Sequence, residues 1–149
     1  MKFFVFIALF SALFSFSAEW KLDFEKAKTE AAQSHKFVLL NFSGSDWCIP
    51  CIKLKKDIFE SEDFTRFASE KLILVRADFP RLKKNQLDLW QISHNEALAE
   101  KYNQQGKFPL TLLLDSNGKI LKEWEGYPSN LSVKTFIHDI NTIFEAKSK

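Results

Sequence analysis

Two cysteines, Cys48 and Cys51, are the residues in this chain whose type and spacing most directly indicate chemistry. They stand in the segment Trp47-Cys48-Ile49-Pro50-Cys51, and the 149 residues contain no other cysteine. A thiolate can attack a disulfide to form a mixed disulfide, which a second thiolate nearby then resolves. A bridge between cysteines three positions apart closes too small a loop to constrain the unfolded chain much. The pair therefore indicates redox function rather than stabilisation.

The sequence predicts a helix from Cys48 to about Glu60, with Pro50 in its first turn, where the missing N–H costs nothing. Unsatisfied backbone N–H groups and the helix dipole lower the pKa of a thiol at such a position. We therefore expect Cys48 to attack and Cys51, one turn inside the helix, to resolve. Trp47 would supply a flat apolar contact beside the exposed sulfur, and simple packing is the alternative role for its ring.

Two cysteines at this spacing also make half of a zinc site, so a metal has to be considered. The remaining soft ligands are His35, His94 and His138, and none of them is paired at ligand spacing. We expect these histidines to be structural or exposed. The sequence therefore predicts no metal and no cofactor.

The amino-terminal segment has the pattern of a signal peptide. Lys2 precedes an apolar run that extends to Phe14, and Ser15-Phe16-Ser17 provides a small-x-small cleavage signature. We expect residues 1–17 to be removed and residues 18–149 to form one domain that is periplasmic or otherwise exported and does not span the membrane. An uncleaved anchor is the alternative, but the apolar run is shorter than the roughly 20 residues needed to cross a bilayer. With 21 Lys and Arg against 19 Asp and Glu, no basic run indicates a nucleic-acid partner.

Hydrophobic periodicity predicts the remaining elements of an α/β domain. Helices are expected at 24–34 after a cap at Asp23, after a cap at Ser61, from a capping box at Ser93 to about Tyr102, and over 133–144. Strands are expected at 36–42, 72–75, 110–114 and 119–124, the last two joined by the turn 115–118. Residues 79–92 have no clean period and are predicted to be loop and irregular helix. This order implies a central mixed β-sheet flanked by helices on both faces.

With these elements placed, residues 18–149 resemble the thioredoxin superfamily along essentially their whole length. The segments that carry the resemblance are 37–42, 46–51, 108–111 and 115–118. The resemblance implies a thioredoxin fold in which Phe108-Pro109 is a cis peptide facing the cysteines. It also implies that the backbone before this proline pairs with an extended substrate, so Trp47, Phe108 and Pro109 would bind substrate. A trans proline opening a strand is the alternative.

The sequence departs from the family at the position of the buried acid. Thioredoxins usually place an Asp beneath the second cysteine, whereas the corresponding residue here is Asn41, which cannot act as a base. Arg76 occupies roughly the place of the family's partner lysine, and Asp46 is the nearest acid in sequence. The group that accepts the proton of Cys51 is therefore not identified by the sequence.

The lead-in Ser-Gly-Ser-Asp-Trp-Cys and the signal-peptide pattern resemble envelope thioredoxin-like proteins such as the DsbH type of periplasmic reductase. Pro50 matches the reducing thioredoxin pattern, and oxidising relatives often carry a His between the cysteines. The resemblance thus implies a monomeric protein-disulfide reductase that acts on disulfide-bearing exported proteins and receives electrons from a membrane donor of the DsbD kind. One alternative is a binding module or chaperone for unfolded or cysteine-bearing clients, suggested by Trp47, Phe108 and Trp90. Another is a structural role with an inert disulfide.

Overall fold

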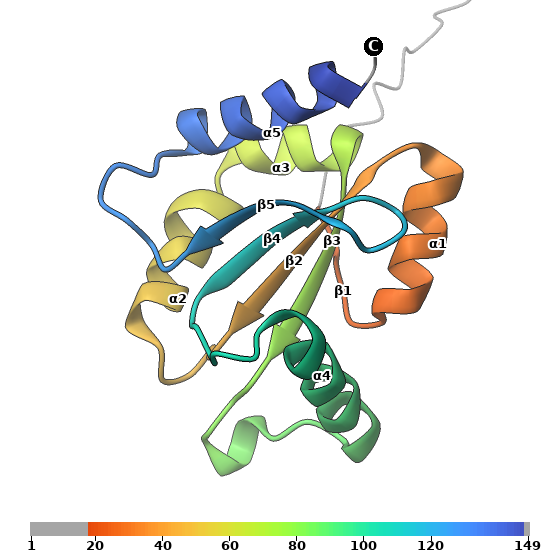
Figure 1. Ribbon diagram of the computed structural model, residues 1–149. Coiled ribbons are helices and arrows are strands. Elements are labelled where there is room, and N and C mark those ends of the chain that lie inside the picture. The colour runs from red at the N-terminus through yellow and green to blue at the C-terminus, as the bar shows by residue number, and fades with distance from the viewer. Residues whose placement is uncertain (1–17, 148–149) are drawn as a thin grey trace, which may run out of the picture.

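A five-stranded mixed sheet forms the centre of the protein in the computed structural model, which describes residues 18–147 (Figure 1). The strand order is β1-β3-β2-β4-β5. Strands β1 (Trp20–Lys21), β3 (Leu72–Asp78) and β2 (Phe37–Ser43) are parallel, whereas β4 (Leu110–Leu114) and β5 (Ile120–Glu125) pair antiparallel. The predicted mixed sheet is confirmed, and the predicted signal peptide at 1–17 lies outside the described residues.

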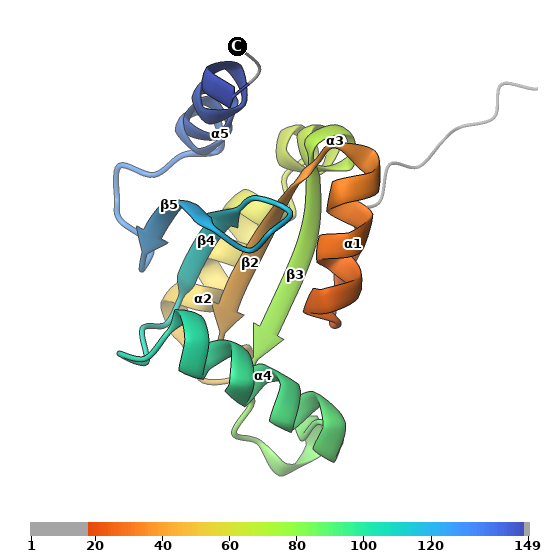
Figure 2. The same ribbon diagram turned by 45° about the vertical axis from the view of Figure 1, so that its right-hand side comes forward.

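Helices cover both faces of this sheet (Figures 1 and 2). The face with α1 (Phe24–Ser34) also receives α4 (Leu89–Tyr102). The opposite face carries α2 (Ile49–Leu54), the π-helical turn η1 (Lys55–Phe59), α3 (Glu62–Lys71) and α5 (Val133–Lys147). The expected α/β class with two helical layers is therefore confirmed.

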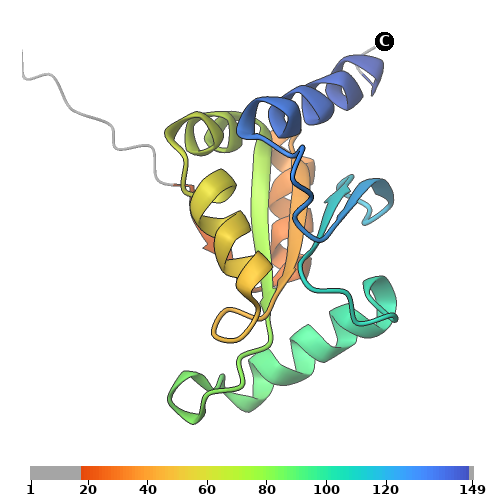
Figure 3. The ribbon, with the colours of Figure 1, turned by 90° about the vertical axis from the view of Figure 1, so that its left-hand side faces the viewer.

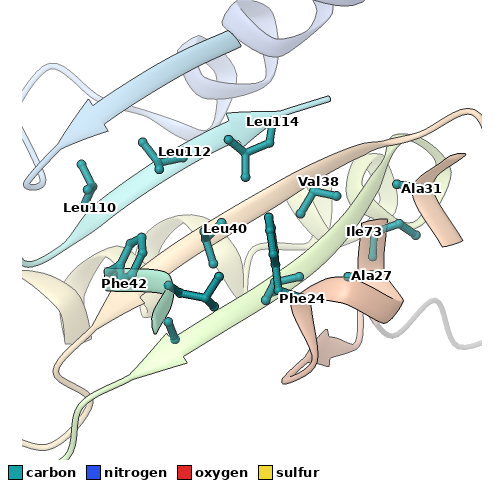
Figure 4. Close-up of a cluster of buried hydrophobic side chains, with 13 residues drawn as sticks. Phe24, Ala27, Ala31, Val38, Leu40, Phe42, Ile73, Leu110, Leu112 and Leu114 are labelled. Atoms are coloured by element: carbon teal, nitrogen blue, oxygen red, sulfur yellow. The ribbon is translucent and has the colours of Figure 1, made fainter. Parts of the chain in front are cut away.

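Strand β2 is the centre of the core because both of its faces are buried. Val38, Leu40 and Phe42 point to the α1 side, where they join a cluster with residues of β3, β4 and α1 (Figure 4). Leu39 points to the other side, as the period of two in a strand requires. This explains why the segment is apolar without alternation, and it fixes the strand from whose end the cysteine loop departs.

The second cluster fixes the helix that follows the cysteines. Leu54 and Ile58 are fully buried on the α2 side of the sheet. Phe59 packs against Phe64 at a ring-centroid distance of 5.3 Å, and Phe136 lies 5.9 Å from Phe64. Burial of each such side chain contributes about 1.5–3 kcal/mol, so α2 and η1 are held firmly against the sheet.

The structure corrects the predicted start of α4. The carboxylate of Asp88 accepts a hydrogen bond from the Gln91 backbone N–H at 2.8 Å, so the helix begins at Leu89 and Ser93 lies inside it. The capping box predicted at Ser93 is wrong, because a better cap stands one turn earlier. The predicted caps at Asp23 and Ser61 are confirmed by their side-chain hydrogen bonds.

Strand β3 is longer than predicted and continues through Asp78. Arg76 and Asp78 pair in parallel register with Asn41 and Ser43 of β2. Because the two strands are parallel and end together, the residues that follow them emerge at the same edge of the sheet. This edge is where the two cysteines lie.

Candidate active site

Cys48 is the N-cap residue of α2, and it is bonded to Cys51 in a disulfide. The Cys51 backbone N–H donates a hydrogen bond to Cys48 Sγ at an N to S distance of 3.3 Å. Pro50 occupies the second position of the helix, as its lack of an N–H allows. The predicted placement of the pair at a helix start is confirmed.

The two sulfurs differ in their surroundings. The N–H that points at Cys48 Sγ, together with the positive end of the α2 dipole, favours negative charge on this atom after reduction. Cys51 lies one turn into the helix, and the side chains of Cys48 and Cys51 are 5% and 3% exposed. Both cysteines are buried, so the predicted exposure of the sulfur beside Trp47 is wrong for this disulfide state. The hydrogen bond and the position at the helix start, rather than burial, distinguish Cys48 as the sulfur suited to attack.

Trp47 is fixed by three contacts immediately before the cysteine pair. Its indole Nε1–H donates to the Phe79 carbonyl at 2.7 Å, and its ring meets the edge of Phe108 at a centroid distance of 5.4 Å. The Arg81 guanidinium lies 3.7 Å from the Trp47 ring centroid, within the range of a cation–π interaction. The Trp47 side chain is therefore held in place by its neighbours and is not free to move at the surface.

Asp46 ties the cysteine loop to the segment that follows β3. Its carboxylate accepts from the Arg81 and Leu82 backbone N–H groups, both at 2.9 Å, and from Asn85 Nδ2 at 3.0 Å. Hydrogen bonding by the Arg81 N–H is the largest cause that lowers the pKa of Asp46 below its ordinary value. A carboxylate stabilised in this way is a weak base, so the structure gives Asp46 a role in loop geometry.

A second tie reinforces the first. The Ser45 backbone N–H and hydroxyl both donate to the carboxylate of Asp78, the last residue of β3. Figure 3 shows the loop before α2 and the segment after β3 side by side at the same end of the molecule. Cys48 is thus positioned by two segments more than 30 residues apart in sequence.

The Phe108-Pro109 peptide is cis, as the family resemblance implies. Pro109 is buried and directly precedes β4. Phe108 is half-buried, and its ring contacts both Trp47 and Phe79, the latter at a centroid distance of 5.5 Å. The structure therefore brings Trp47 and Phe108 together, with Phe79 as a third ring that sequence reasoning did not single out.

A polar row crosses the sheet on the face that α2 covers. Asn41 follows Leu39 by two residues and so lies on the same face of β2. It pairs in register with Arg76 and Thr111, and its Nδ2 donates a hydrogen bond to Thr111 Oγ1 at 3.1 Å. Asn41 is buried and cannot act as a base. The row holds no carboxylate where the family usually places one, so its chemistry here is neutral apart from Arg76.

The side chain of Arg76 contacts an aromatic ring on the neighbouring strand β1. Its guanidinium lies 4.3 Å from the ring centroid of Trp20. Burial lowers the pKa of Arg76 from its ordinary value, and the charges of Asp78 and Glu60 partly oppose that shift. Among residues 18–147, no group hydrogen-bonds its buried Nε. Arg76 thus lies beside Asn41 in register, and its guanidinium contacts the Trp20 ring.

Three residues with contacts at the site were missed by sequence reasoning: Phe79, Arg81 and Thr111. A topological signal could have found the first two, because the carboxyl ends of adjacent parallel strands meet at one edge of a sheet. Trp90 lies elsewhere, stacked on His94 of α4 at a centroid distance of 5.0 Å. His94 Nε2 accepts from the Phe24 backbone N–H at 3.1 Å, so its role is structural.

Metal binding can be considered only for the described part of the chain. Within residues 18–147, no group of three or more His, Cys, Asp and Glu side chains is arranged to hold a metal ion. The two sulfurs that would form half of a zinc site are bonded to each other.

A mixed sheet, a cysteine pair at a helix start and a cis proline directly before β4 together define a thioredoxin-like protein. Residues 19–116 match the thioredoxin-like family, and the chain belongs to that family. The predicted superfamily and fold are confirmed.

Two named relatives and one solved structure are similar to this chain. The chain is 37% identical to the "Disulfide bond reductase DsbH" of Chlamydia pneumoniae over 103 residues, which are 69% of this chain and 60% of that protein. It is 30% identical to the "Thioredoxin-related protein DsbJ" of the same organism over 98 residues, 66% of this chain and 27% of that protein. The solved structure of a "DsbH Oxidoreductase" matches with a TM-score of 0.75 and 29% identity, covering 87% of this chain and 85% of the other. The matched region thus spans about 60% of the length of the first of these relatives.

Proposed function

We propose that the chain is a thiol:disulfide oxidoreductase that reduces or exchanges disulfides in exported proteins. The observation that carries the proposal is the hydrogen bond from the Cys51 N–H to Cys48 Sγ at the start of α2. This geometry favours a thiolate at Cys48 once the disulfide is reduced. Similarity to a protein named as a disulfide bond reductase supports the same assignment.

The reaction needs only the two cysteines and a substrate disulfide. The Cys48 thiolate attacks one sulfur of the substrate, forms a mixed disulfide with it and releases the other sulfur as a thiolate. The Cys51 thiolate then attacks Cys48 Sγ, which restores the Cys48–Cys51 disulfide and releases the second substrate sulfur. Two electrons pass from the protein dithiol to the substrate, and an external dithiol must reduce the pair again.

An insulin-reduction assay with dithiothreitol tests this assignment. The expected result is that Cys48→Ser abolishes the acceleration seen with the wild type. Cys51→Ser is the matched variant, because it retains the attacking thiol but cannot resolve. When it is prereduced and then mixed with insulin without dithiothreitol, it is expected to accumulate a mixed disulfide detectable by mass spectrometry. Equal rates for wild type and Cys48→Ser would exclude the proposed reaction.

The direction of electron flow follows from the reduction potential. The intervening pair Ile49-Pro50 matches the reducing pattern of the superfamily, so we propose a reductase rather than an oxidase. A glutathione redox titration is expected to give a potential in the range of thioredoxin, about −270 mV, rather than near −120 mV as in the strong oxidant DsbA. A potential well below −300 mV would instead indicate an inert structural disulfide.

A second candidate function is binding of unfolded or cysteine-bearing clients. Ile49 and Ile52 on α2 are 67% and 46% exposed beside the cysteine pair, and such apolar side chains favour contact with an extended polypeptide. Capture of an unfolded client by the double variant Cys48→Ala and Cys51→Ala would support this function. If that double variant no longer captured any unfolded client, the binding function would be excluded and the redox function would remain.

We also propose that the protein acts in the periplasm with a membrane electron donor of the DsbD kind. The signal-peptide pattern at 1–17 and the similarity to Dsb proteins support this location. Within residues 18–147, no helix combines the length and the apolar character needed to cross a bilayer. Cell fractionation with a carboxyl-terminal epitope tests the location, and recovery of the protein with the cytoplasmic fraction would contradict it.

A further inference from the structure

The segments that surround the cysteine pair carry a concentrated positive charge. Residues 44–56 and 79–87 contain six basic residues against a single acid, Asp46. The rest of the chain contains fifteen basic and eighteen acidic residues, so it is net negative although the whole chain has a formal charge of +2. Three acids border these ranges, and each has a partner of its own: Asp57 lies near the Tyr127 hydroxyl, Asp78 accepts from Ser45, and Asp88 caps α4. The excess of cations therefore lies in the segments next to the disulfide.

The fold brings these two segments together rather than leaving the cations scattered. The carboxylate of Asp46 binds the backbone of Arg81 and Leu82 and the side chain of Asn85, which holds Lys83 and Lys84 beside the cysteine loop. The basic residues of α2 and η1 follow shortly after the cysteines, and all six basic residues are exposed. We call this group the basic rim: Lys53, Lys55, Lys56, Arg81, Lys83 and Lys84.

Little within the protein neutralises the basic rim. The carboxylate of Asp46 accepts three hydrogen bonds from the segment after β3, and Glu60 forms an ion pair with Lys55 at 3.3 Å. Asp57 of η1 lies within hydrogen-bond distance of the Tyr127 hydroxyl. Among the described residues, no acid lies within ion-pair distance of five of the six cations, which are Lys53, Lys56, Arg81, Lys83 and Lys84.

Exposed apolar side chains accompany the cations in both segments. Ile49 and Ile52 are exposed on α2, and Leu82 is 48% exposed between Arg81 and Lys83. A partner that covers this surface has to place both apolar groups and negative charge near its reacting cystine. A basic partner segment would instead face like charges, which costs affinity and slows association.

Resting on the proposed function, we propose that the preferred substrates carry acidic residues next to the disulfide that is reduced. The occupant of the surface is an extended polypeptide segment whose cystine contacts Ile49 and whose Asp and Glu side chains face the basic rim. Charge complementarity of this kind acts mainly on the association rate, by about tenfold or more at low ionic strength. Substrate choice is therefore expected to depend on salt.

The test uses three cyclic disulfide peptides of equal length whose cysteines are flanked by Glu, by Gln or by Lys. The second-order rate of reduction by the prereduced protein is measured by stopped flow at low salt and at about 0.5 M NaCl, where surface charges are largely screened. We expect the Glu peptide to react about tenfold faster than the Lys peptide at low salt. The preference is expected to shrink to about twofold at high salt.

The matched variants reverse the same charge at two places. Lys83→Glu with Lys84→Glu changes the basic rim and is expected to slow the Glu peptide about tenfold and to accelerate the Lys peptide. Lys134→Glu with Lys147→Glu changes net charge equally, but both residues lie on α5, which packs through Phe144 on Phe37 at the opposite end of β2. This control pair is expected to leave the rates and the peptide preference within about twofold of the wild type.

The outcomes separate the inference from the function on which it rests. Equal rates for the three peptides, with normal insulin reduction, would overturn the inference and leave the proposed function intact. Failure to reduce any peptide or insulin would overturn both. Binding to phosphatidylserine vesicles that Lys83→Glu with Lys84→Glu abolishes, without any change in peptide preference, would assign the basic rim to a membrane surface and overturn the inference.

Discussion

Replacement of Gly44 by Ala is expected to disturb the cysteine site through Trp47. A Cβ atom at residue 44 would overlap the Trp47 indole, in direct conflict with ring atoms Cε2, Cζ2 and Nε1. The backbone at this glycine does not have a positive φ, so the cost arises from the contact rather than from backbone strain. Trp47 has to move, and its movement displaces the residue directly before Cys48.

The magnitude follows from two contributions. Overpacking of this kind costs about 1–3 kcal/mol. The shift also strains or breaks the 2.7 Å hydrogen bond from Trp47 Nε1 to the Phe79 carbonyl, whose net contribution is about 1 kcal/mol. We therefore expect the free energy of unfolding to fall by about 2–3 kcal/mol, which is less than the simple sum because the two costs share one movement.

Urea unfolding at pH 7 measures the loss of stability, and insulin reduction measures the effect on the site. The reduction rate is expected to fall about tenfold as the helix start loses its geometry. Gly106→Asn is the control, because no atom lies within 4 Å of a Cβ at this position and Asn tolerates its positive φ. A Gly44→Ala variant with wild-type stability and activity would refute the packing that we assign to Trp47.

Three further predictions concern side chains around the site and the core. The pKa of Asp46 is lowered in the folded protein, so the carboxylate stabilises the fold fully when the pH is above the ordinary pKa of 3.8. This stabilisation is lost as the pH falls through the lower pKa of the folded state. Asp46→Asn should remove this part of the acid dependence of stability in urea titrations between pH 6 and 2. His94→Ala should lower the free energy of unfolding by about 1 kcal/mol because the Phe24 N–H loses its acceptor, whereas His94→Gln should recover part of the loss, and equal stability of all three proteins would contradict the hydrogen bond. Asn41→Asp places a carboxyl group in the buried core, and burial raises its pKa. Relative to wild type, the variant should therefore be less stable at pH 8 than at pH 5 by about 1–3 kcal/mol. If the stability difference from wild type did not change with pH, Arg76 would have to neutralise the new charge.

Much of the fold could be predicted because local patterns and tertiary packing agree in this chain. The continuous apolar run at β2 indicated a central strand, and Asp23 and Ser61 marked helix starts that their hydrogen bonds confirm. The start of α4 was missed because Ser93 also fits a capping pattern, and only the structure shows that Asp88 caps the helix one turn earlier. Strand β1, with two residues, is too short to give a periodic signal.

The cysteine pair could be predicted for a different reason, since its chemistry depends on residues close together in sequence. Its neighbours across the loop could be predicted only from the topology of the sheet, and not from local sequence. Phe79 and Arg81 follow β3, and nothing in their local pattern indicates contact with Trp47. That contact depends on the parallel pairing of β2 with β3, which is a property of the assembled sheet.

The same loop contacts link the position of Cys48 to the position of the basic rim. Ser45, Asp46 and Trp47 each hydrogen-bond to the segment that begins at Asp78, so the two segments form one unit. A change that loosens this unit therefore moves both the attacking sulfur and the cations that would attract a substrate. Charge reversal at Lys83 and Lys84 avoids this coupling because neither side chain takes part in those hydrogen bonds. For this reason the charge-reversal pair can separate substrate attraction from the chemistry of the dithiol, whereas any substitution at Asp46 would alter both.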